Sequence, residues 1–342
     1  MKKLFIYIVT DGSSRLLAGS TAVEWLRKGA GDIPYRVIED LSQAILPTGC
    51  DFVAVLHPTT PLVTAKILLD LSREMERRDV GGLEIGAGML VKRELFERGV
   101  IPKRRITASY AEETTSTEAY FRAEKALYRR IAEDLIRKGA IIPDPDAVRV
   151  DARSVVEEGA IIEPYVKIEG SRVARGARIG SFSEMTNAEI GAGAEIRRSV
   201  VQDSQVGENA TIGPFAYIRM GAEIGAGCRV GDFVEIKKSR LGARTKAAHL
   251  AYIGDAEVGA GTNVGCGTVF ANYDGKVKRR VKVGDRVFIG ANSNLVAPVT
   301  VGDDVYIAAA TTVTRDVPQG SFVIGRTKAE NREKRGGNGF PV

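Results

Sequence analysis

The sequence predicts a two-part protein, with an α/β domain in the N-terminal third and a parallel β-helix in the C-terminal half. Short apolar segments at residues 4–9 and 52–56 have the length of buried strands in an α/β domain. From residue 150 onward, apolar side chains recur at every sixth position. Gly follows many of these apolar residues directly, as at Ile212-Gly213. Together these observations indicate an α/β domain followed by an all-β domain.

In the N-terminal part, the two expected strands are separated from later helices by turn-forming residues. A turn at His57-Pro58 follows the second strand, and a helix is expected around residues 64–77. Residues 117–139 have the charged amphipathic pattern of a second helix, which Gly139 ends. Prolines in the next ten residues break the pattern, so we expect the domain boundary there.

The predicted organisation has four parts. They are a shortened α/β domain at 1–116, a linker helix and connection at 117–149, a β-helix at 150–315 and a C-terminal tail at 316–342.

A period of six matches neither an α-helix nor a simple alternating strand. It fits a short strand plus a corner, with one apolar side chain pointing into the coil and a Gly that permits the turn. Three such hexads close a triangular coil of about 18 residues, and stacked coils cover one another's apolar edges. The three clearest runs are Val150, Val156, Ile162, Ile168; Val206, Ile212, Ile218, Ile224, Val230, Ile236; and Val283, Ile289, Leu295, Val301, Ile307, Val313.

The repeat is interrupted at two polar segments. Around residues 242–252 the six-residue step is expected to slip, and residues 268–282 leave the pattern as a projecting loop. Since the rest of a solenoid surface is committed to stacking, such breaks are the expected places for function. The first break contains His249, one of the two histidines in the chain.

Composition excludes several classes of protein. The net charge of +6 comes from scattered Lys and Arg, which suits anionic small molecules better than nucleic acid. Cys50, Cys228 and Cys266 show neither metal-binding spacing nor a disulfide framework. No apolar stretch approaches 18 residues and the N-terminus has no cleavage site for a signal peptide, so we expect a cytoplasmic protein without membrane or nucleic-acid partners.

Three segments of the β-helix carry a specific resemblance. DFVEIKK at 232–238 is similar to an NFVE-KK motif, HLAYIGD lies at 249–255, and NYDG lies at 272–275. At these separations they resemble the acetyltransferase domain of the bifunctional N-acetylglucosamine-1-phosphate uridyltransferase/glucosamine-1-phosphate N-acetyltransferases, over about residues 125–326. The resemblance implies a left-handed β-helix and a homotrimer with active sites between subunits. It implies acetyl-CoA as co-substrate and a product that feeds UDP-N-acetylglucosamine and cell-wall precursor synthesis.

The resemblance also implies roles for individual residues. His249 matches the catalytic base, and Glu235 matches the carboxylate that orients it. The other implied positions are sugar-phosphate contacts at Arg219, Lys237, Tyr252, Asn263, Asn272 and Lys278, and coenzyme contacts at Tyr273, Ala291, Ala309 and Arg326. This set makes chemical sense, because an amine attacks a thioester only after a base has taken its proton, and phosphate needs cations.

The chain departs from the family pattern at several positions. Ala291 stands where the family has Ser, and Met220 where it has Pro. In the N-terminal part, the phosphate loop is reduced to IVTDGSSRLL with only Arg15 kept. A metal-binding GDxPL motif is replaced by residues 58–62, and a metal-binding Asn by Thr115. Thr hydroxyls are poor Mg²⁺ ligands, so we expect a degenerate nucleotidyltransferase-like (Rossmann-like) domain, no metal and a structural role for His57.

Two alternatives stay open at this point. The chain could keep uridylyl transfer from UTP as a second activity, although the missing phosphate loop argues against it. It could instead be a non-catalytic trimeric scaffold, which the intact Glu235, His249 and Asn272 argue against. A carbonic anhydrase of the same fold is excluded, because it needs three zinc-binding histidines.

Overall fold

The computed structural model describes residues 3–10, 16–45, 48–106, 108, 110, 113–327 and 329. By contacts the chain divides into two compact units, Met1–Asn187 and Ala188–Val342, each taken by itself here. The division falls inside the six-residue repeat, where each coil contacts mainly its neighbours. The predicted limits at 116, 149 and 315 therefore stay predictions.

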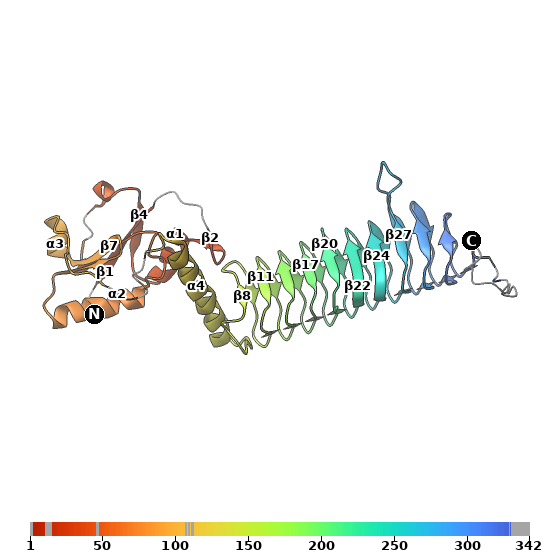
Figure 1. Ribbon diagram of the computed structural model, residues 1–342, viewed down its shortest axis with the longest axis horizontal. Helices are drawn as coiled ribbons and strands as arrows, with labels where there is room; N and C mark the ends of the chain where they lie inside the picture. Colours follow the sequence, from red (N-terminus) through yellow and green to blue (C-terminus); the bar gives the residue numbers. More distant parts are fainter. Residues whose placement is uncertain are drawn as a thin grey trace, which may run out of the picture. The chain divides into compact units, whose positions relative to one another are not determined.

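A five-stranded mixed sheet forms the first part of unit 1 (Figure 1). Its order is β4-β1-β5-β7-β6, with β1 parallel to β4 and β5, and β7 antiparallel to β5 and β6. The strands are β1 (Leu4–Val9), β4 (Tyr35–Ile38), β5 (Phe52–Leu56), β6 (Gly82–Ile85) and β7 (Gly88–Lys92), with a separate hairpin of β2 (Leu16–Leu17) and β3 (Ser20–Thr21).

The longer helices of unit 1 begin at side chains that cap them. Thr21 and Glu24 form a capping box, Thr64 accepts from the Ile67 amide, and Ser116 accepts from the Ala119 amide. The helices are α1 (Ala22–Ala30), α2 (Ala65–Arg77), α3 (Arg93–Glu97) and α4 (Thr117–Arg137), with a 3₁₀ turn at Leu41–Gln43.

The sheet and helices share an apolar core, in which Ile6, Ile8, Leu26, Leu56 and Leu68 are at most 1% exposed. The prediction of a Rossmann-like α/β domain is confirmed. The expected strands coincide with β1 and β5, and the expected helices with α2 and α4.

The first coils of the β-helix also belong to unit 1. Ile162 pairs with Ile179 and Ile168 with Met185 in parallel register, and all four side chains are fully buried. The strands are β8 (Arg149–Val150), β9 (Val155–Val156), β10 (Ile161–Ile162), β11 (Lys167–Glu169), β12 (Arg172–Val173), β13 (Arg178–Ile179) and β14 (Glu184–Thr186).

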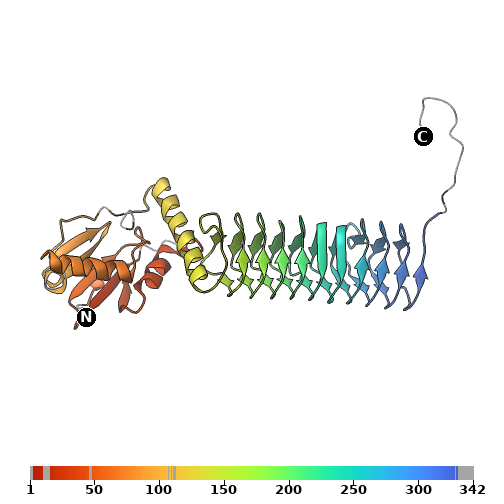
Figure 2. The same cartoon turned by 90° about the horizontal axis from the view of Figure 1, so that it is seen from below.

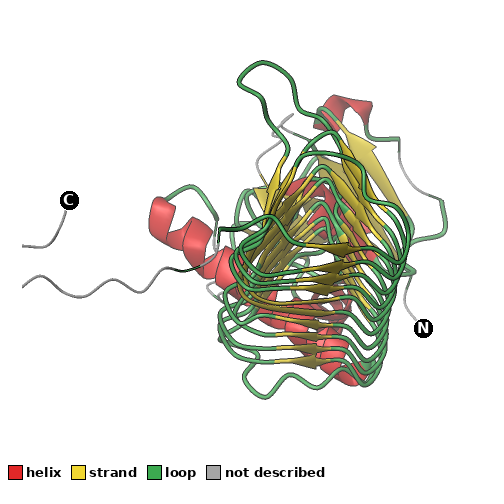
Figure 3. Ribbon diagram, turned by 90° about the vertical axis from the view of Figure 1, so that its right-hand side faces the viewer, coloured by secondary structure: helices red, strands yellow, loops and turns green. Residues whose placement is uncertain are grey.

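Unit 2 continues the same repeat, and its coils have a triangular outline when viewed end-on (Figure 3). Ile196 pairs with Ile212, and Ile212 with Val230, so that each buried residue covers the one before it. The prediction of a left-handed parallel β-helix is confirmed.

The strands of unit 2 are mostly two or three residues long. They are β15 (Glu189–Ile190), β16 (Glu195–Ile196), β17 (Val200–Gln202), β18 (Gln205–Val206), β19 (Thr211–Ile212), β20 (Tyr217–Arg219), β21 (Glu223–Ile224), β22 (Arg229–Lys237), β23 (Arg240–Leu241), β24 (Lys246–Gly254), β25 (Ala256–Val258), β26 (Asn263–Val264), β27 (Val269–Ala271), β28 (Val281–Val283), β29 (Phe288–Ile289), β30 (Asn294–Val296), β31 (Val299–Val301), β32 (Tyr306–Ile307), β33 (Thr312–Val313) and β34 (Phe322–Val323).

The predicted slip at 242–252 is wrong. Leu241, Ala247 and Ile253 are all buried and lie six positions apart, so the hexads are intact there. The small Ala247 occupies a place that usually holds a β-branched residue, which hides the repeat in the sequence. The shorter steps fall on either side, from Ile236 to Leu241 and from Ile253 to Val258.

The predicted projecting loop is confirmed. Between β27 and β28 the chain leaves the coil and returns as a hairpin, closed by an antiparallel bridge between Tyr273 and Lys278 (Figure 1). Asp274 shapes its tip by accepting from the amides of Lys276 and Val277 at 2.9 and 2.7 Å. Within the part of the chain that is described, no helix has the length and apolar character to cross a membrane.

Candidate active site on two long strands

The two longest strands of the chain, β22 and β24, lie side by side in unit 2 (Figure 2). Each has nine residues and continues around a corner at which neighbouring coils are interrupted. The strands approach closely because Gly231 has no side chain. A Cβ at this position would lie 1.7 Å from the carbonyl oxygen of Ala248.

This close approach places His249 beside an acidic side chain. His249 pairs in register with Asp232, and its Nδ1 lies 2.8 Å from Asp232 Oδ1. The two side chains are 57% and 41% exposed, so a ligand can reach them. The hydrogen bond from His249 lowers the pKa of Asp232 below its ordinary value, and the backbone amide of Asp232 and the positive charge of Arg229 act in the same direction.

Within the chain, Glu235 contacts Arg219 and not His249, and its predicted role of orienting the imidazole stays a prediction. It pairs in register with Tyr252, three positions along β22 from Asp232. Its Oε1 accepts from Nε and NH2 of Arg219 at 2.9 and 2.6 Å. The carboxylate therefore orders the guanidinium and leaves the imidazole to Asp232.

A second cluster centres on Asp255, which directly follows β24. Its Oδ2 accepts from Asn272 Nδ2 at 2.5 Å and lies 3.8 Å from Lys237 Nζ. The amide of Asn272 also lies 3.5 Å from the Tyr252 hydroxyl. Lys237 and Asn272 are each 6% exposed, whereas the neighbouring Lys238 is exposed. The cluster brings together three of the predicted sugar-phosphate contacts.

The remaining predicted sugar-phosphate contacts are Lys278 and Asn263. Lys278 is exposed in the projecting loop, and Asn263 is half-buried on β26, where it pairs with Lys246 and Phe288. Tyr273 is exposed in the same loop, and its hydroxyl donates to the Gly275 carbonyl at 2.6 Å.

The other predicted coenzyme contacts lie on later coils. Arg326 NH1 donates to the Ala309 carbonyl at 2.7 Å, which brings these two positions together. The amide of Ala310, the next residue, donates to the carbonyl of Ala291 at 2.8 Å, so Ala291 and Ala309 lie on stacked coils. Both alanines are exposed. Their small side chains leave the backbone open to a ligand.

Met220, the other departure from the family pattern, follows Arg219 at the end of β20. Its sulfur lies 3.1 Å from NH1 of Arg219. Its φ of 57° is a conformation that Pro cannot adopt.

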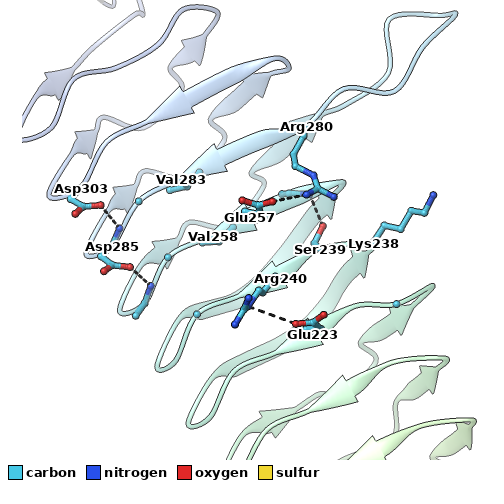
Figure 4. A pocket seen from close by; sticks show the side chains of 16 residues that line it. Glu223, Lys238, Ser239, Arg240, Glu257, Val258, Arg280, Val283, Asp285 and Asp303 are labelled. Carbon is cyan, nitrogen blue, oxygen red and sulfur yellow. Dashed lines mark hydrogen bonds and ion pairs between the residues drawn. The ribbon is translucent and has the colours of Figure 1, made fainter.

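A groove of about 740 Å³ lies on another face of unit 2, formed by β21, β23, β25, β28 and β31 (Figure 4). None of the predicted site residues lines it. Its charges largely pair with one another, as between Arg240 and Glu223 at 3.7 Å and Arg280 and Glu257 at 2.5 Å. The groove is thus separate from the site that the sequence indicates.

The degenerate motif of the N-terminal domain forms internal contacts. His57 Nδ1 lies 3.1 Å from the Thr59 hydroxyl, and Thr60 donates its hydroxyl to the His57 carbonyl at 2.9 Å. Thr115 is exposed. Arg15 lies outside the described residues. Among the residues that are described, no group of three or more His, Cys, Asp or Glu is placed to hold a metal ion.

Sequence reasoning missed Asp232 and Asp255, although both belong to the motifs that it singled out. Asp232 begins DFVE and Asp255 ends HLAYIGD. The sequence feature that could have revealed them is their position within the coil repeat. Asp232 is 17 positions before His249, which is close to one full turn, so their side chains meet on adjacent coils.

Comparison with known proteins shows which families the chain resembles. The model of the bacterial transferase hexapeptide family (six repeats) matches residues 203–238 and 280–315. Bifunctional protein GlmU from a Nostoc species is 47% identical over 207 residues, which cover 60% of this chain and 46% of the relative. The GlmU proteins of Clostridioides difficile and Clostridium novyi are 45% and 48% identical over 62% and 61% of this chain, and 46% of each relative.

The chain is similar to the GlmU proteins in their acetyltransferase half. The resemblance predicted from DFVEIKK, HLAYIGD and NYDG is thereby confirmed. The chain spans about half the length of these GlmU relatives. Among solved structures, LpxA from Bacteroides fragilis, a UDP-N-acetylglucosamine acyltransferase, is 21% identical over 51% of this chain and 68% of its own, with a TM-score of 0.31. That likeness is too weak to bear on the chemistry of the site.

Proposed function

We propose that the chain is an N-acetyltransferase that moves an acetyl group from acetyl-CoA to glucosamine 1-phosphate or a closely related amino-sugar 1-phosphate. The product, N-acetylglucosamine 1-phosphate, would serve UDP-N-acetylglucosamine and cell-wall precursor synthesis in the cytoplasm. The observation that carries the proposal is the identity of 47% to a bifunctional GlmU protein over 207 residues. His249 stands exposed on a long strand, beside an acidic partner, in agreement with a role as base.

The proposed reaction needs one base and no covalent intermediate. His249 Nε2 takes a proton from the amino group as the amine nitrogen bonds to the thioester carbonyl carbon. The C–S bond then breaks, and the departing thiolate receives the proton from the imidazolium. Backbone N–H groups are suitable donors for the oxyanion that forms between these steps. Protons balance, and neither a metal nor a redox partner is needed.

The sugar phosphate has a set of cationic and amide groups available. Arg219 is held by Glu235 with its side chain 27% exposed, and the exposed Lys278 adds a second charge. Asn272 is fixed by Asp255, which supports a role in fixing the position of the amino sugar. We assign the same role to Asn263, and we assign Lys237 and Tyr252 to the sugar phosphate. In the proposal, the small Ala291 and Ala309 leave space for the coenzyme, with Arg326 and Tyr273 as further contacts.

We further propose a homotrimer in which a neighbouring subunit completes each site. Its support is the family resemblance together with the exposure of His249 in the single chain. Light scattering at micromolar concentration should give three times the mass of 36.8 kDa. A monomeric mass with full activity would contradict it.

The test is release of coenzyme A thiol from acetyl-CoA across a panel of amino-sugar 1-phosphates, with each product identified by mass. Glucosamine 1-phosphate should be the best acceptor. His249→Ala should lower kcat by about 10²–10⁴-fold, the usual contribution of a general base. The matched control is His57→Gln, which changes the other histidine and should leave kcat unaltered.

No acetylation of any amino sugar by the wild-type chain, or equal turnover after His249→Ala, would refute the proposal and favour a scaffold role. A separate arm with UTP, Mg²⁺ and N-acetylglucosamine 1-phosphate tests uridylyl transfer. We expect no pyrophosphate there, because Thr59 and Thr115 replace the metal-binding residues of the family motifs.

A further inference from the structure

Among the residues that the structure describes, the imidazole of His249 has one side-chain partner, which is Asp232 rather than Glu235. The two residues are directly opposite each other on β22 and β24, with Nδ1 and Oδ1 2.8 Å apart. The contact does not depend on long flexible side chains, because Asp is short and the two backbones are close together. Gly231, immediately before Asp232, makes this approach possible.

The chemistry of the pair determines which ring nitrogen carries the proton. An ionised carboxylate can only accept hydrogen bonds, so the 2.8 Å contact requires the hydrogen on Nδ1. The pKa of Asp232 lies below its ordinary value, chiefly because of this hydrogen bond, and the carboxyl group is therefore ionised at neutral pH. Nε2, on the far side of the ring, then keeps its lone pair for a substrate proton.

We infer that Asp232 is a positioning residue that fixes the Nδ1–H tautomer of His249 and holds Nε2 outward as the base. Asp232 itself does not touch the reacting atoms. Its carboxylate also stabilises the imidazolium that forms when Nε2 takes the proton. The tautomer follows from the contact between Asp232 and His249, whereas the effect on kcat rests on the proposed function.

Glu235 is unsuited to this role because its carboxylate already has a partner. It accepts two hydrogen bonds from Arg219, and it pairs with Tyr252, three positions beyond His249. Replacing Glu235 should therefore disturb sugar-phosphate binding through Arg219 and raise KM, whereas replacing Asp232 should lower kcat. This difference separates the two carboxylates in one set of kinetic measurements.

The tautomer can be read directly, because the chain has only two histidines. In a His57→Gln background, ¹⁵N NMR of the remaining imidazole at alkaline pH reports which nitrogen is protonated. We expect a predominant Nδ1–H signal. Asp232→Ala should shift the population toward Nε2–H, the form that an unconstrained imidazole favours. Asp232→Asn keeps an oxygen acceptor and should retain much of the Nδ1–H form.

The kinetic arm uses the same variants with acetyl-CoA and glucosamine 1-phosphate. Asp232→Ala should lower kcat by about 10–100-fold with little change in either KM, the size expected for removing the partner of a functional His. The kcat of Asp232→Asn should lie between the kcat of Asp232→Ala and that of the wild type. The matched control, Glu223→Gln, removes an exposed carboxylate from a different face and should change neither measurement.

An unchanged tautomer in Asp232→Ala would overturn the inference, whatever the activity of the protein. An altered tautomer with wild-type kcat would also overturn it, since positioning would then have no effect on turnover. If the wild-type chain acetylates no amino sugar, the proposed function fails. The NMR arm still decides whether Asp232 sets the tautomer.

Discussion

At the scale of single residues, the most consequential contact outside the imidazole pair is the one that Asp255 makes. Its carboxylate lies beside the buried Lys237 ammonium and accepts from the buried Asn272 amide. Removing it would leave the ammonium without its counter-charge in a place with little access to water. Asp255 therefore links the stability of the coil to the order of two proposed substrate contacts.

Asp255→Ala should lower the free energy of unfolding by about 3 kcal/mol, as expected for breaking a buried ion pair by removing one partner. Urea unfolding monitored by circular dichroism measures this change. Adding Lys237→Met removes the orphaned charge and should recover part of the loss. Equal stability of the single and double variants would show that Lys237 does not depend on Asp255.

Asp151 in unit 1 gives a prediction about pH. Burial alone would raise the pKa of this carboxyl group, but hydrogen bonds from Ser154, the Gly170 amide and Arg153 together hold the pKa below its usual value. A group whose pKa is lower in the folded state stabilises the protein above its unfolded pKa of about 3.9. This stabilisation is lost as the pH falls through the folded pKa.

Asp151→Asn should therefore lower the free energy of unfolding most at pH 7, by about 2 kcal/mol, because the charged hydrogen bonds are lost. The difference from the wild type should narrow as the pH falls below about 4, where the wild-type carboxyl group gains its proton. Urea titrations at several pH values test this. Glu158→Gln, in an exposed ion pair with Arg175, is the control and should have little effect at any pH. If the stability difference between Asp151→Asn and the wild type instead grows as the pH falls, the predicted direction is wrong.

The motifs picked out residues, and the structure shows which of these lie together. Tyr252 and Asn272 lie in one cluster, whereas the predicted roles of His249, Tyr252 and Asn272 stay predictions. The contact between Asp232 and His249 could not be read from the sequence, because such contacts are set by which positions stack on adjacent coils. Glu235 is closer to His249 in sequence than Asp232 is, yet the register brings Asp232 to it.

At the scale of elements, the site depends on two paired strands that are longer than their neighbours. Gly231 permits this pairing, and a methyl group there would overlap the Ala248 carbonyl oxygen. Since backbone atoms cannot move aside as a flexible side chain can, the strands must separate. Separation would act first on the contact between Asp232 and His249.

Gly231→Ala should destabilise unit 2 by about 3 kcal/mol through overpacking and should also lower kcat. The control, Gly221→Ala, isolates backbone strain, because Gly221 has a φ of +76° but open space around its Cβ position. Gly221→Ala should lower the free energy of unfolding by only about 1 kcal/mol. Urea midpoints of both variants measure the difference. Equal midpoints would argue that the close approach is unimportant.

The elements that the sequence located best are those with the clearest periodicity. β1, β5, α2 and the short strands of the six-residue repeat fall where they were expected. The misplaced slip at 242–252 has a simple cause, since Ala247 is buried like its β-branched neighbours but is not recognisable as a core residue from its type. Five-residue steps next to it shift the count further.

At the scale of the whole molecule, the β-helix has no single centre, because each coil is covered mainly by the coils on either side. The fold class was predictable from the sequence since this repetition shows directly in the spacing of Val, Ile and Leu. The domain limits stay predictions, because a stack of similar coils offers no sharp boundary at which to divide it. The N-terminal domain followed from two strands and two helices alone.

A core substitution in one coil should therefore have a local effect. Ile212 is fully buried and pairs with Ile196 and Val230 on the coils to either side. Ile212→Ala should lower stability by about 3 kcal/mol. Hydrogen exchange should speed up around these three residues and remain unchanged near Ile307. Uniform acceleration through unit 2 would indicate one cooperative core instead.

The pairing of Asp232 with His249 makes the spacing between them as important as their identity. Inserting or deleting one residue in the segment that joins them would shift the register of β24 against β22 by one position. Another residue of β24 would then lie opposite Asp232, and the imidazole of His249 would lose its partner. A point substitution at Asp232 can weaken the contact, whereas inserting one residue between Asp232 and His249 would abolish it.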